Sequence, residues 1–155
     1  MLYYNILITA VLFVLMLICI WNLYLLRRKN YPDVNEDELP FVSVLVPARN
    51  EELNIHSILS SLLEQDYPNY EVIVLNDSSD DNTGELINTL KIKYPELKVL
   101  NGKPLEKGWT GKCYACKQLF ESAAGDYLLF TDADTVHNPN SLRGSVKIAL
   151  NRKAD

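Results

Sequence analysis

The first 26 residues of this 155-residue chain contain no Asp, Glu, Lys or Arg, so all of its charged residues lie in residues 27–155. Only three cysteines are present, too few for a disulfide scaffold. The chain also lacks a basic stripe, and its formal net charge of −5 argues against nucleic acid as a partner. Because 48% of the residues are apolar, a disordered chain is excluded. What remains is a hydrophobic segment joined to a body large enough for one domain.

Residues 2–26 predict a transmembrane helix. A helix rises about 1.5 Å per residue and the hydrocarbon core is about 30 Å thick, so roughly 20 residues suffice to cross it. Basic residues follow at 27–29, and by the positive-inside rule they predict a single-pass protein of the cell membrane with a cytoplasmic C-terminal domain. A cleaved signal peptide fits less well, because the sequence has neither a positive start nor a small-residue cleavage site.

The rest of the chain alternates between strand and helix patterns. Residues 27–40 are polar, contain two prolines and predict a juxtamembrane linker. Residues 41–155 then predict one domain. We expect strands at 41–47, 71–76, 97–100 and 126–134, and helices at 50–65, 83–94, 111–124 and from about 138. The alternation of strands and helices, with strands that are nearly continuously apolar, predicts an α/β fold with a mainly parallel sheet and helices on both faces.

Polar residues gather where three of these strands end. In parallel sheets, ligands bind outside the carboxyl ends of the strands. Residues 47–52 follow the first strand, residues 76–81 follow the second, and Asp132 and Asp134 follow the fourth. The sequence therefore predicts a ligand site built from these three segments.

Asp132 and Asp134 predict a divalent cation site. Two carboxylates one residue apart repel each other unless a cation lies near them. Mg²⁺ and Mn²⁺ bind oxygen ligands of this kind, commonly through one or two carboxylates together with substrate phosphates. The structural alternative is a solvated acidic loop or a cap for the next helix.

Asp77 and Arg49 are candidates for contacts with a nucleotide. A carboxylate at the end of a strand can accept hydrogen bonds from a base or a ribose, although Asp77 and its acidic neighbours could equally cap the helix at 83–94. Residues 49–52 are expected to open the first helix of the body, where Glu51 and Glu52 would complement the helix dipole. Arg49 is the better candidate there for a phosphate or base contact.

Residues 107–112 form a Gly-rich basic segment that enters the third helix of the body. Its backbone N–H groups and Lys112 could meet a phosphate. The spacing is not that of a Walker A loop, and no GxGxxG is present. Cys113 and Cys116 form a CxxC pair without the further ligands that zinc would need.

Four motifs, taken together and in order, resemble family 2 glycosyltransferases of the GT-A fold: VSVLVPARNEE, VIVLNDSSDDNTGEL, KGWTGKCYACKQ and YLLFTDADT. The resemblance covers about residues 41–150. The GWTGK segment and the helix after it look like the membrane-associated subgroup that acts on carotenoid, hopanoid or similar lipid acceptors. Where the family commonly has Asp-Asp-Gly-Ser after the second strand, this chain has Asn76 followed by Asp77.

The resemblance implies a metal-dependent, inverting transfer of a sugar from a nucleotide-diphospho-sugar, with UDP as the expected carrier, to a lipid-type acceptor. It implies that Asp77 contacts a uracil-type base and that Lys112 lies by the ribose or phosphates. Asp134 would bind Mg²⁺ or Mn²⁺ directly, and Asp132 would bridge to the ribose or the metal. The residues implied for the base and ribose pocket are Pro47, Ala48, Arg49 and Glu51.

In this family the general base lies downstream of the acidic pair, so no catalytic residue is expected before Asp155. The resemblance therefore implies the donor-binding half of a longer enzyme, inactive by itself.

Two other interpretations compete with a glycosyltransferase. LLFTDADT literally meets the DxDxT signature of haloacid dehalogenase-type phosphatases at residues 132–135, in which Asp132 would be the nucleophile and Asp134 the general acid, again with Mg²⁺. That motif normally opens its domain, whereas here it comes last. The other alternative is a membrane-tethered nucleotide-binding module without catalytic activity.

Overall fold

The computed structural model describes residues 2–27, 36 and 39–152. The chain forms two compact units, Met1–Pro32 and Asp33–Asp155. Most of the predicted linker at 27–40, including Arg28 and Lys29, lies outside the described residues.

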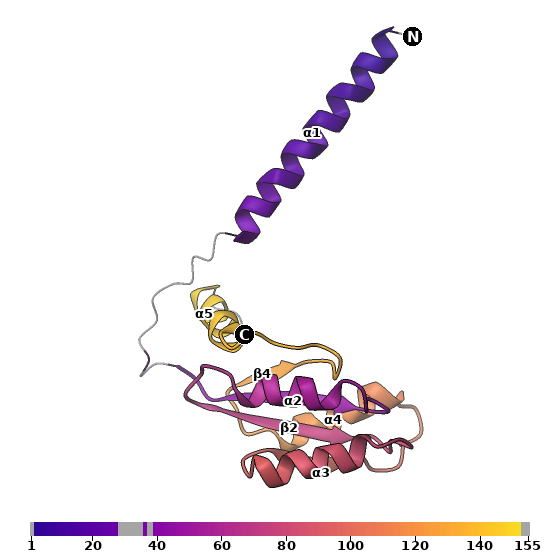
Figure 1. Cartoon of the computed structure of the whole chain (residues 1–155), viewed down its shortest axis with the longest axis vertical. Helices are drawn as coiled ribbons and strands as arrows, with labels where there is room; N and C mark the ends of the chain where they lie inside the picture. Colours follow the sequence, from indigo (N-terminus) through magenta and orange to yellow (C-terminus); the bar gives the residue numbers. More distant parts are fainter. Residues whose placement is uncertain (1, 28–35, 37–38, 153–155) are drawn as a thin grey trace. The chain divides into compact units, whose positions relative to one another are not determined.

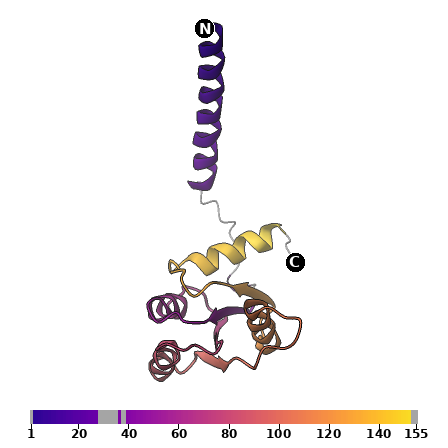
Figure 2. The ribbon, with the colours of Figure 1, turned by 90° about the vertical axis from the view of Figure 1, so that its right-hand side faces the viewer.

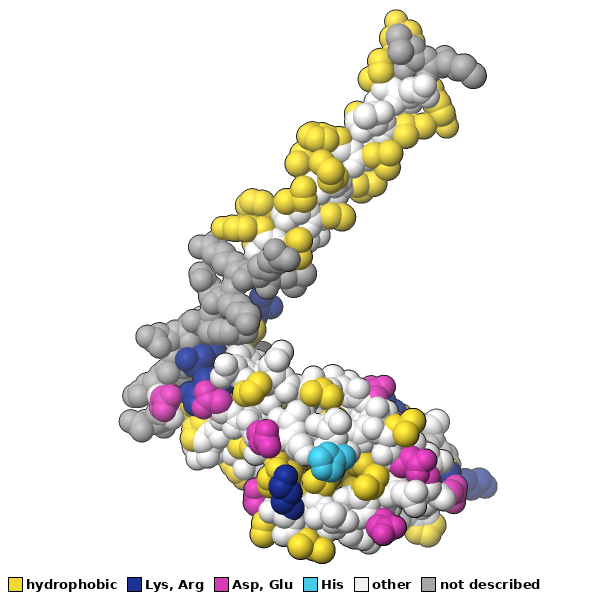
Figure 3. Space-filling view, in the orientation of Figure 1, with side chains coloured by type: hydrophobic (Ala, Val, Ile, Leu, Met, Phe, Trp, Pro, Cys, Tyr) yellow, Lys and Arg dark blue, Asp and Glu magenta, His cyan; other side chains and the backbone are white. Residues whose placement is uncertain are grey.

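The described part of the first unit is helix α1 (Leu2–Arg27; Figure 1). Figure 3 shows apolar side chains along this helix, whereas charged side chains are spread over the second unit. The stretch Tyr3–Leu25 is long and apolar enough to cross a membrane, and none of it is buried in the structure. By length and composition a signal sequence meets the same test.

The second unit is built on a four-stranded sheet. Its strands are β1 (Val42–Ala48), β2 (Tyr70–Asn76), β3 (Lys98–Asn101) and β4 (Tyr127–Phe130), in the spatial order β3-β2-β1-β4. Every pairing is parallel. Since β1 pairs with β2 on one side and with β4 on the other, the segments that follow these three strands leave the sheet at the same edge.

Four helices cover the two faces of this sheet: α2 (Ile55–Leu63), α3 (Thr83–Lys93), α4 (Gly111–Ser122) and α5 (Ser141–Arg152). Figure 2 shows α2 and α3 on one face and α4 on the other. The predicted α/β fold, with a parallel sheet and helices on both faces, is confirmed.

Successive side chains along the strands point to opposite faces of the sheet, and this divides the core into two clusters. Val44 and Val46 of β1 point to one face and pack with α2, α3 and α5, in a cluster that includes Ile58, Ile87 and Leu142. Leu45 of β1 points to the other face and packs with Ile73, Leu75, Ala115 and Leu119. Because both faces are covered, β1 and β2 are apolar at almost every position rather than at every second one.

Two predicted boundaries were wrong. The first helix of the body begins at Ile55 instead of residue 50, so residues 49–52 form a loop and Glu51 and Glu52 do not occupy a helical first turn. The fourth strand ends at Phe130, so Asp132 and Asp134 lie in the loop that follows it.

A buried carboxylate joins the amino ends of the strands, opposite the edge where the polar loops lie. Glu71 of β2 is 8% exposed and pairs with Lys98 of β3. Its Oε1 accepts hydrogen bonds from Ser43 Oγ of β1 (2.5 Å) and from the backbone N–H of Ala124 (3.0 Å). Gly125 N donates to the same Ser43 oxygen at 2.9 Å. This cluster therefore joins three strands to the turn that follows α4.

The environment of Glu71 determines its charge. Burial alone would raise the pKa of this carboxyl, but hydrogen bonds from Lys98, Ser43 and the Ala124 N–H lower the pKa below its ordinary value of 4.5. The ionised form is therefore the one that stabilises the fold. That contribution is present above the pKa of the unfolded chain and is lost as pH falls through the folded pKa.

We predict that Glu71→Gln, which keeps the side-chain volume but removes the charge, destabilises the full chain at pH 7 by about 1–3 kcal/mol, because it weakens hydrogen bonds that end on a buried charged group. The difference from the unsubstituted chain should shrink as pH falls below 4.5, the ordinary value of a glutamate. Denaturant unfolding of the detergent-solubilised chain across this pH range measures both effects.

Glu121→Gln is the matched control, because Glu121 makes only an exposed pair with Lys117 at 3.7 Å. Such pairs contribute roughly 0.5 kcal/mol or less. Equal stability of Glu71→Gln and the unsubstituted chain at pH 7 would contradict the assignment, as would a difference that stays constant down to pH 3.

Candidate functional site

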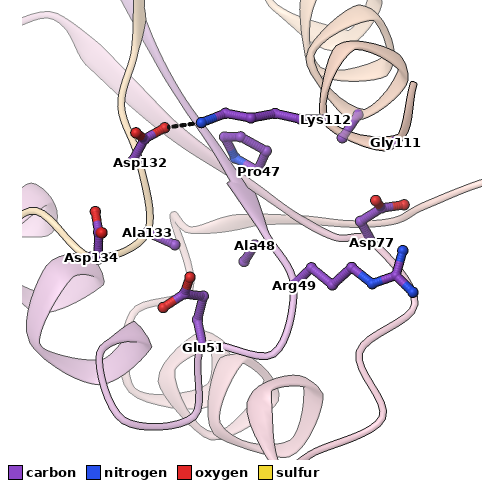
Figure 4. A pocket seen from close by; sticks show the side chains of 11 residues that line it. Pro47, Ala48, Arg49, Glu51, Asp77, Gly111, Lys112, Asp132, Ala133 and Asp134 are labelled. Atoms are coloured by element: carbon purple, nitrogen blue, oxygen red, sulfur yellow. Dashed lines mark hydrogen bonds and ion pairs between the residues drawn. The ribbon is translucent and has the colours of Figure 1, made fainter. Parts of the chain in front are cut away.

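A pocket with a volume of about 280 Å³ lies at the carboxyl ends of β1, β2 and β4. This is near the lower end of the range for small-molecule sites. Figure 4 shows that its walls come from the loops after these strands and from the first turn of α4. The residues that line it are Pro47, Ala48, Arg49, Glu51, Asp77, Gly111, Lys112, Ala115, Asp132, Ala133 and Asp134.

The structure thus brings every predicted site residue to one pocket: Pro47, Ala48, Arg49, Glu51, Asp77, Lys112, Asp132 and Asp134. Sequence reasoning did not select Gly111, Ala115 and Ala133. Gly111 and Ala115 lie one helical turn apart on α4, a spacing that could have indicated a shared face. Ala133 is 4% exposed and lies in the core between the two aspartates.

Reciprocal hydrogen bonds join the loops after β1 and β2. Asn50 N donates to Ser79 Oγ (3.1 Å), and Asp80 N donates back to Asn50 Oδ1 (2.9 Å). Glu51 N donates to Thr83 Oγ1 (2.8 Å), at the start of α3. Asn50 has a φ of 56°, a conformation that asparagine tolerates better than most residues. These contacts use the backbone of residues 50 and 51, which explains why α2 begins later than its apolar pattern predicts.

Asp77 lies between two glycines, one of which packs tightly against it. Asp77 N donates to Ala48 O and Gly102 N donates to Asn76 O, both at 2.9 Å. The backbone hydrogen bonding between the strands therefore continues past the strand ends. A Cβ on Gly102 would lie 3.0 Å from Asp77 Oδ1 and 3.1 Å from its Cα, a tight fit. Gly111, the first residue of α4, has room for a Cβ 3.7 Å from Asp77 Oδ2. The carboxylate of Asp77 therefore lies beside the beginning of α4.

Asn76, which stands where the family commonly has an acid, stabilises the loop that follows it. Its Oδ1 accepts a hydrogen bond from Ser79 N at 3.1 Å. A Cβ on Gly84 would lie 2.8 Å from Asn76 Nδ2, so the amide packs directly over the first turn of α3. The side chain of Asn76 therefore makes its contacts within the protein, and it does not line the pocket.

An ion pair crosses the pocket. Lys112 Nζ lies 2.7 Å from Asp132 Oδ1, and Figure 4 shows the lysine extending past Pro47 to reach it. Hydrogen bonding to Asp132, reinforced by its negative charge, raises the pKa of Lys112, so the ammonium stays charged. Both side chains are more than half exposed, so the pair is weak enough for a bound ligand to replace it.

Asp134 has a different environment. Its Oδ1 accepts a hydrogen bond from Thr135 Oγ1 at 3.2 Å, and no ion pair to it is found among residues 39–152. Figure 4 shows Arg49 and Asp77 on the opposite side of the pocket from Asp134. Of the two acidic-loop carboxylates, Asp134 is the one that forms no ion pair with a lysine or arginine in the described part of the chain.

The donor set in the pocket suits a divalent cation. Four carboxylates (Glu51, Asp77, Asp132 and Asp134) and two cations (Arg49 and Lys112) line it, leaving two negative charges in excess. No group of three or more His, Cys, Asp or Glu side chains in the described part of the chain could hold a metal by itself. Oxygen ligands favour Mg²⁺ or Mn²⁺, and these ions normally complete their coordination with water and substrate phosphates. The residues present therefore fit such an ion in combination with a phosphate ligand.

The CxxC pair shows no sign of redox activation. Cys113 is exposed on α4, and burial raises the pKa of the Cys116 thiol, which keeps it protonated. Packing is the role that the structure supports for Cys116.

The comparisons with known proteins begin with sequence. The model of the family "Glycosyl transferase family 2" matches residues 43–155. The chain is 39% identical over 115 residues to the probable glycosyltransferase YdaM of Bacillus subtilis, covering 72% of this chain and 27% of that protein. It is 36% identical over 110 residues to a beta-monoglucosyldiacylglycerol synthase of Trichormus variabilis, covering 70% and 23%. The chain thus spans about a quarter of the length of these relatives.

The comparison with solved structures agrees with the family match. The mannosyltransferase PcManGT from Pyrobaculum calidifontis, in complex with GDP-Man and Mn²⁺, matches with a TM-score of 0.65 and 27% identity over 91% of this chain and 41% of that one. S. aureus TarS 1-349 in complex with UDP-GlcNAc matches with a TM-score of 0.58 and 31% identity over 73% and 32%. With the family model covering residues 43–155, this chain belongs to glycosyltransferase family 2 and has the GT-A fold.

Proposed function

We propose that residues 41–155 bind a nucleotide-diphospho-sugar, with UDP as the expected carrier, for transfer of the sugar to a lipid-type acceptor. The observation that carries this proposal is the pocket at the strand ends. There, two acidic-loop carboxylates and Lys112 face Asp77 and Arg49 across a site with two negative charges in excess. UDP-GlcNAc and GDP-Man in the similar structures support a nucleotide-sugar donor of this kind.

Each side chain has a distinct task in this proposal. Asp77 accepts hydrogen bonds from the base, beside Arg49 and the loop that holds Pro47, Ala48 and Glu51. The first residues of α4 line the pocket, and a helix N-terminus favours anions, so the diphosphate is expected beside Gly111 and Lys112. Asp134, with Asp132, would hold Mg²⁺ or Mn²⁺. When bound, such an ion stabilises negative charge on the departing nucleotide.

The acceptor side is proposed on separate grounds. A beta-monoglucosyldiacylglycerol synthase among the relatives supports a lipid-type acceptor, and the carotenoid- or hopanoid-type subgroup stays a prediction. The apolar helix α1 supports a membrane anchor, with the body on the cytoplasmic side as the basic residues after it predict. Since the relatives are about four times as long as the aligned region, we place the general base and acceptor contacts outside this sequence. An inverting transfer is expected from the family resemblance.

The two alternatives are not favoured. A phosphatase of the haloacid dehalogenase type lacks support, because the family match over residues 43–155 is to glycosyltransferases. A binding module without catalytic activity has no similar support, because YdaM, the diacylglycerol synthase and PcManGT are all named as transferases or synthases.

We predict that Asp134→Asn abolishes most of the Mn²⁺-dependent affinity for UDP, because it removes the acidic-loop carboxylate that is not in an ion pair and is therefore available to a cation. The loss should be at least about ten-fold, the effect of losing one charged ligand contact of 1.5 kcal/mol or more. Isothermal titration of the full chain with UDP, in Mn²⁺ and again in EDTA, measures it. Asp80→Asn, an exposed aspartate outside the pocket, is the control and should behave as the unsubstituted chain. Unchanged Mn²⁺-dependent affinity in Asp134→Asn would overturn the proposed function.

We predict that Lys112→Gln weakens UDP binding both in Mn²⁺ and in EDTA, by about ten-fold, because a charge-assisted contact with the diphosphate is lost. The same change should leave uridine binding within about two-fold, since uridine carries no phosphate. Lys93→Gln on α3, a lysine that contacts Tyr94 away from the pocket, controls for the change in net charge. Equal losses for UDP and uridine would place Lys112 away from the phosphates and contradict this assignment.

A further inference from the structure

The loop that carries Asp132 and Asp134 is closed by a side-chain hydrogen bond between its two ends. Thr131 directly follows β4, and its backbone N–H donates to Leu45 O of β1 at 3.1 Å. Six residues later, His137 Nε2 lies 2.8 Å from Thr131 Oγ1. Both side chains are half-buried. This Thr131–His137 contact therefore joins the end of the sheet to the far end of the acidic loop.

The far end of the loop is also fastened to α2 and the residues after it. His137 N donates to Ser61 Oγ at 3.1 Å. Gln65, which is 8% exposed, donates from Nε2 to Asn138 O (2.9 Å) and accepts from Leu142 N at Oε1 (3.0 Å). His137 is thus held on its backbone side by α2 and reaches Thr131 with its ring.

Contacts inside the loop are weaker than those at its ends. Thr135 N donates to Asp132 O at 3.4 Å, and Thr135 Oγ1 donates to Asp134 Oδ1 at 3.2 Å. These are long hydrogen bonds, on exposed groups. Ala133 is fixed by burial in the core, but the aspartates on either side of it are exposed. Asp132 is also paired with Lys112, so Asp134 is the carboxylate whose direction depends most on how the ends of the loop are held.

His137 itself does not line the pocket, so it is not placed to bind a ligand there. Burial lowers its pKa, which keeps the imidazole neutral at physiological pH and leaves one ring nitrogen able to accept and one able to donate. These observations point to an indirect role.

We propose that His137 is a positioning residue that acts through Thr131 to hold the Asp132–Asp134 loop in the conformation that presents its carboxylates to a divalent cation. This inference rests on the proposed function, because it concerns the cation site that the donor would use.

The test compares two amide substitutions at His137 in the full chain, each of which places a nitrogen near one of the two ring nitrogens. Glutamine places its amide nitrogen near the position of Nε2 and can keep the hydrogen bond to Thr131, whereas asparagine places its amide nitrogen near the position of Nδ1 and cannot. Electron paramagnetic resonance measures the Mn²⁺ affinity in the presence of saturating UDP. We expect His137→Asn to weaken Mn²⁺ binding about three- to ten-fold, the usual effect of one lost hydrogen bond, and His137→Gln to stay within about two-fold.

Two further measurements separate positioning from general stability. UDP affinity in EDTA should be unchanged in both His137 variants, because the base and phosphate contacts do not involve this loop contact. Thr131→Val should weaken Mn²⁺ binding as His137→Asn does, and the double variant should be no weaker than either single one, since both remove the same bond. His56→Asn, on the exposed side of α2, is the matched control.

Each outcome decides between the two proposals. If Asp134→Asn lowers Mn²⁺ affinity but His137→Asn does not, the positioning role is overturned and the proposed function stands. If Asp134→Asn leaves Mn²⁺ affinity unchanged, the proposed function itself fails. Equal losses in His137→Asn and His137→Gln, or weaker UDP binding in EDTA, would show that His137 supports the fold rather than the cation site and would overturn the inference.

Discussion

The structure of the body depends on the parallel pairing of β1 with β2 on one side and with β4 on the other. In this register Ala48 lies opposite Asn76, and Leu45 lies opposite Phe130, so three loops leave the sheet at one edge. Those loops are far apart in sequence, and the sheet alone brings them together. The pocket is therefore a consequence of the strand register, and any slip by one residue would exchange the two core faces and separate its walls.

Charged groups at the two ends of the sheet are arranged in opposite ways. At the amino ends, the Glu71 carboxylate is buried and is contacted by Lys98, Ser43 and the segment after α4. At the carboxyl ends, four carboxylates meet only two cationic side chains, and one of these, Lys112, is held by an exposed ion pair. The buried Glu71 cluster at the amino ends therefore stabilises the fold. At the carboxyl ends, two negative charges have no cationic partner in the pocket and are available to a cationic ligand. The contact of His137 with Ser61 of α2 fastens the far end of the acidic loop.

Much of the fold and the site could be predicted because the signals were local. β1 and β2 are nearly continuous apolar runs, and their observed bounds lie within one residue of the predicted ones. The helix start at Ile55 could not be predicted in the same way, since hydrogen bonds from residues 50 and 51 to the loop after β2 compete with the helix and are invisible in sequence. The pairing of Lys112 with Asp132 and that of Thr131 with His137 likewise depend on side-chain conformations that spacing does not specify.

The central claim is that the acidic loop and a nucleotide diphosphate share one divalent cation. Electron–nuclear double resonance of Mn²⁺ bound to the full chain with UDP tests it directly, in protein labelled with ¹³C at the aspartate carboxyl groups. The account predicts that one bound ion couples both to ³¹P of the diphosphate and to ¹³C of an aspartate, and that the ¹³C coupling is reduced or lost in Asp134→Asn. A ³¹P coupling without any aspartate ¹³C coupling would contradict it.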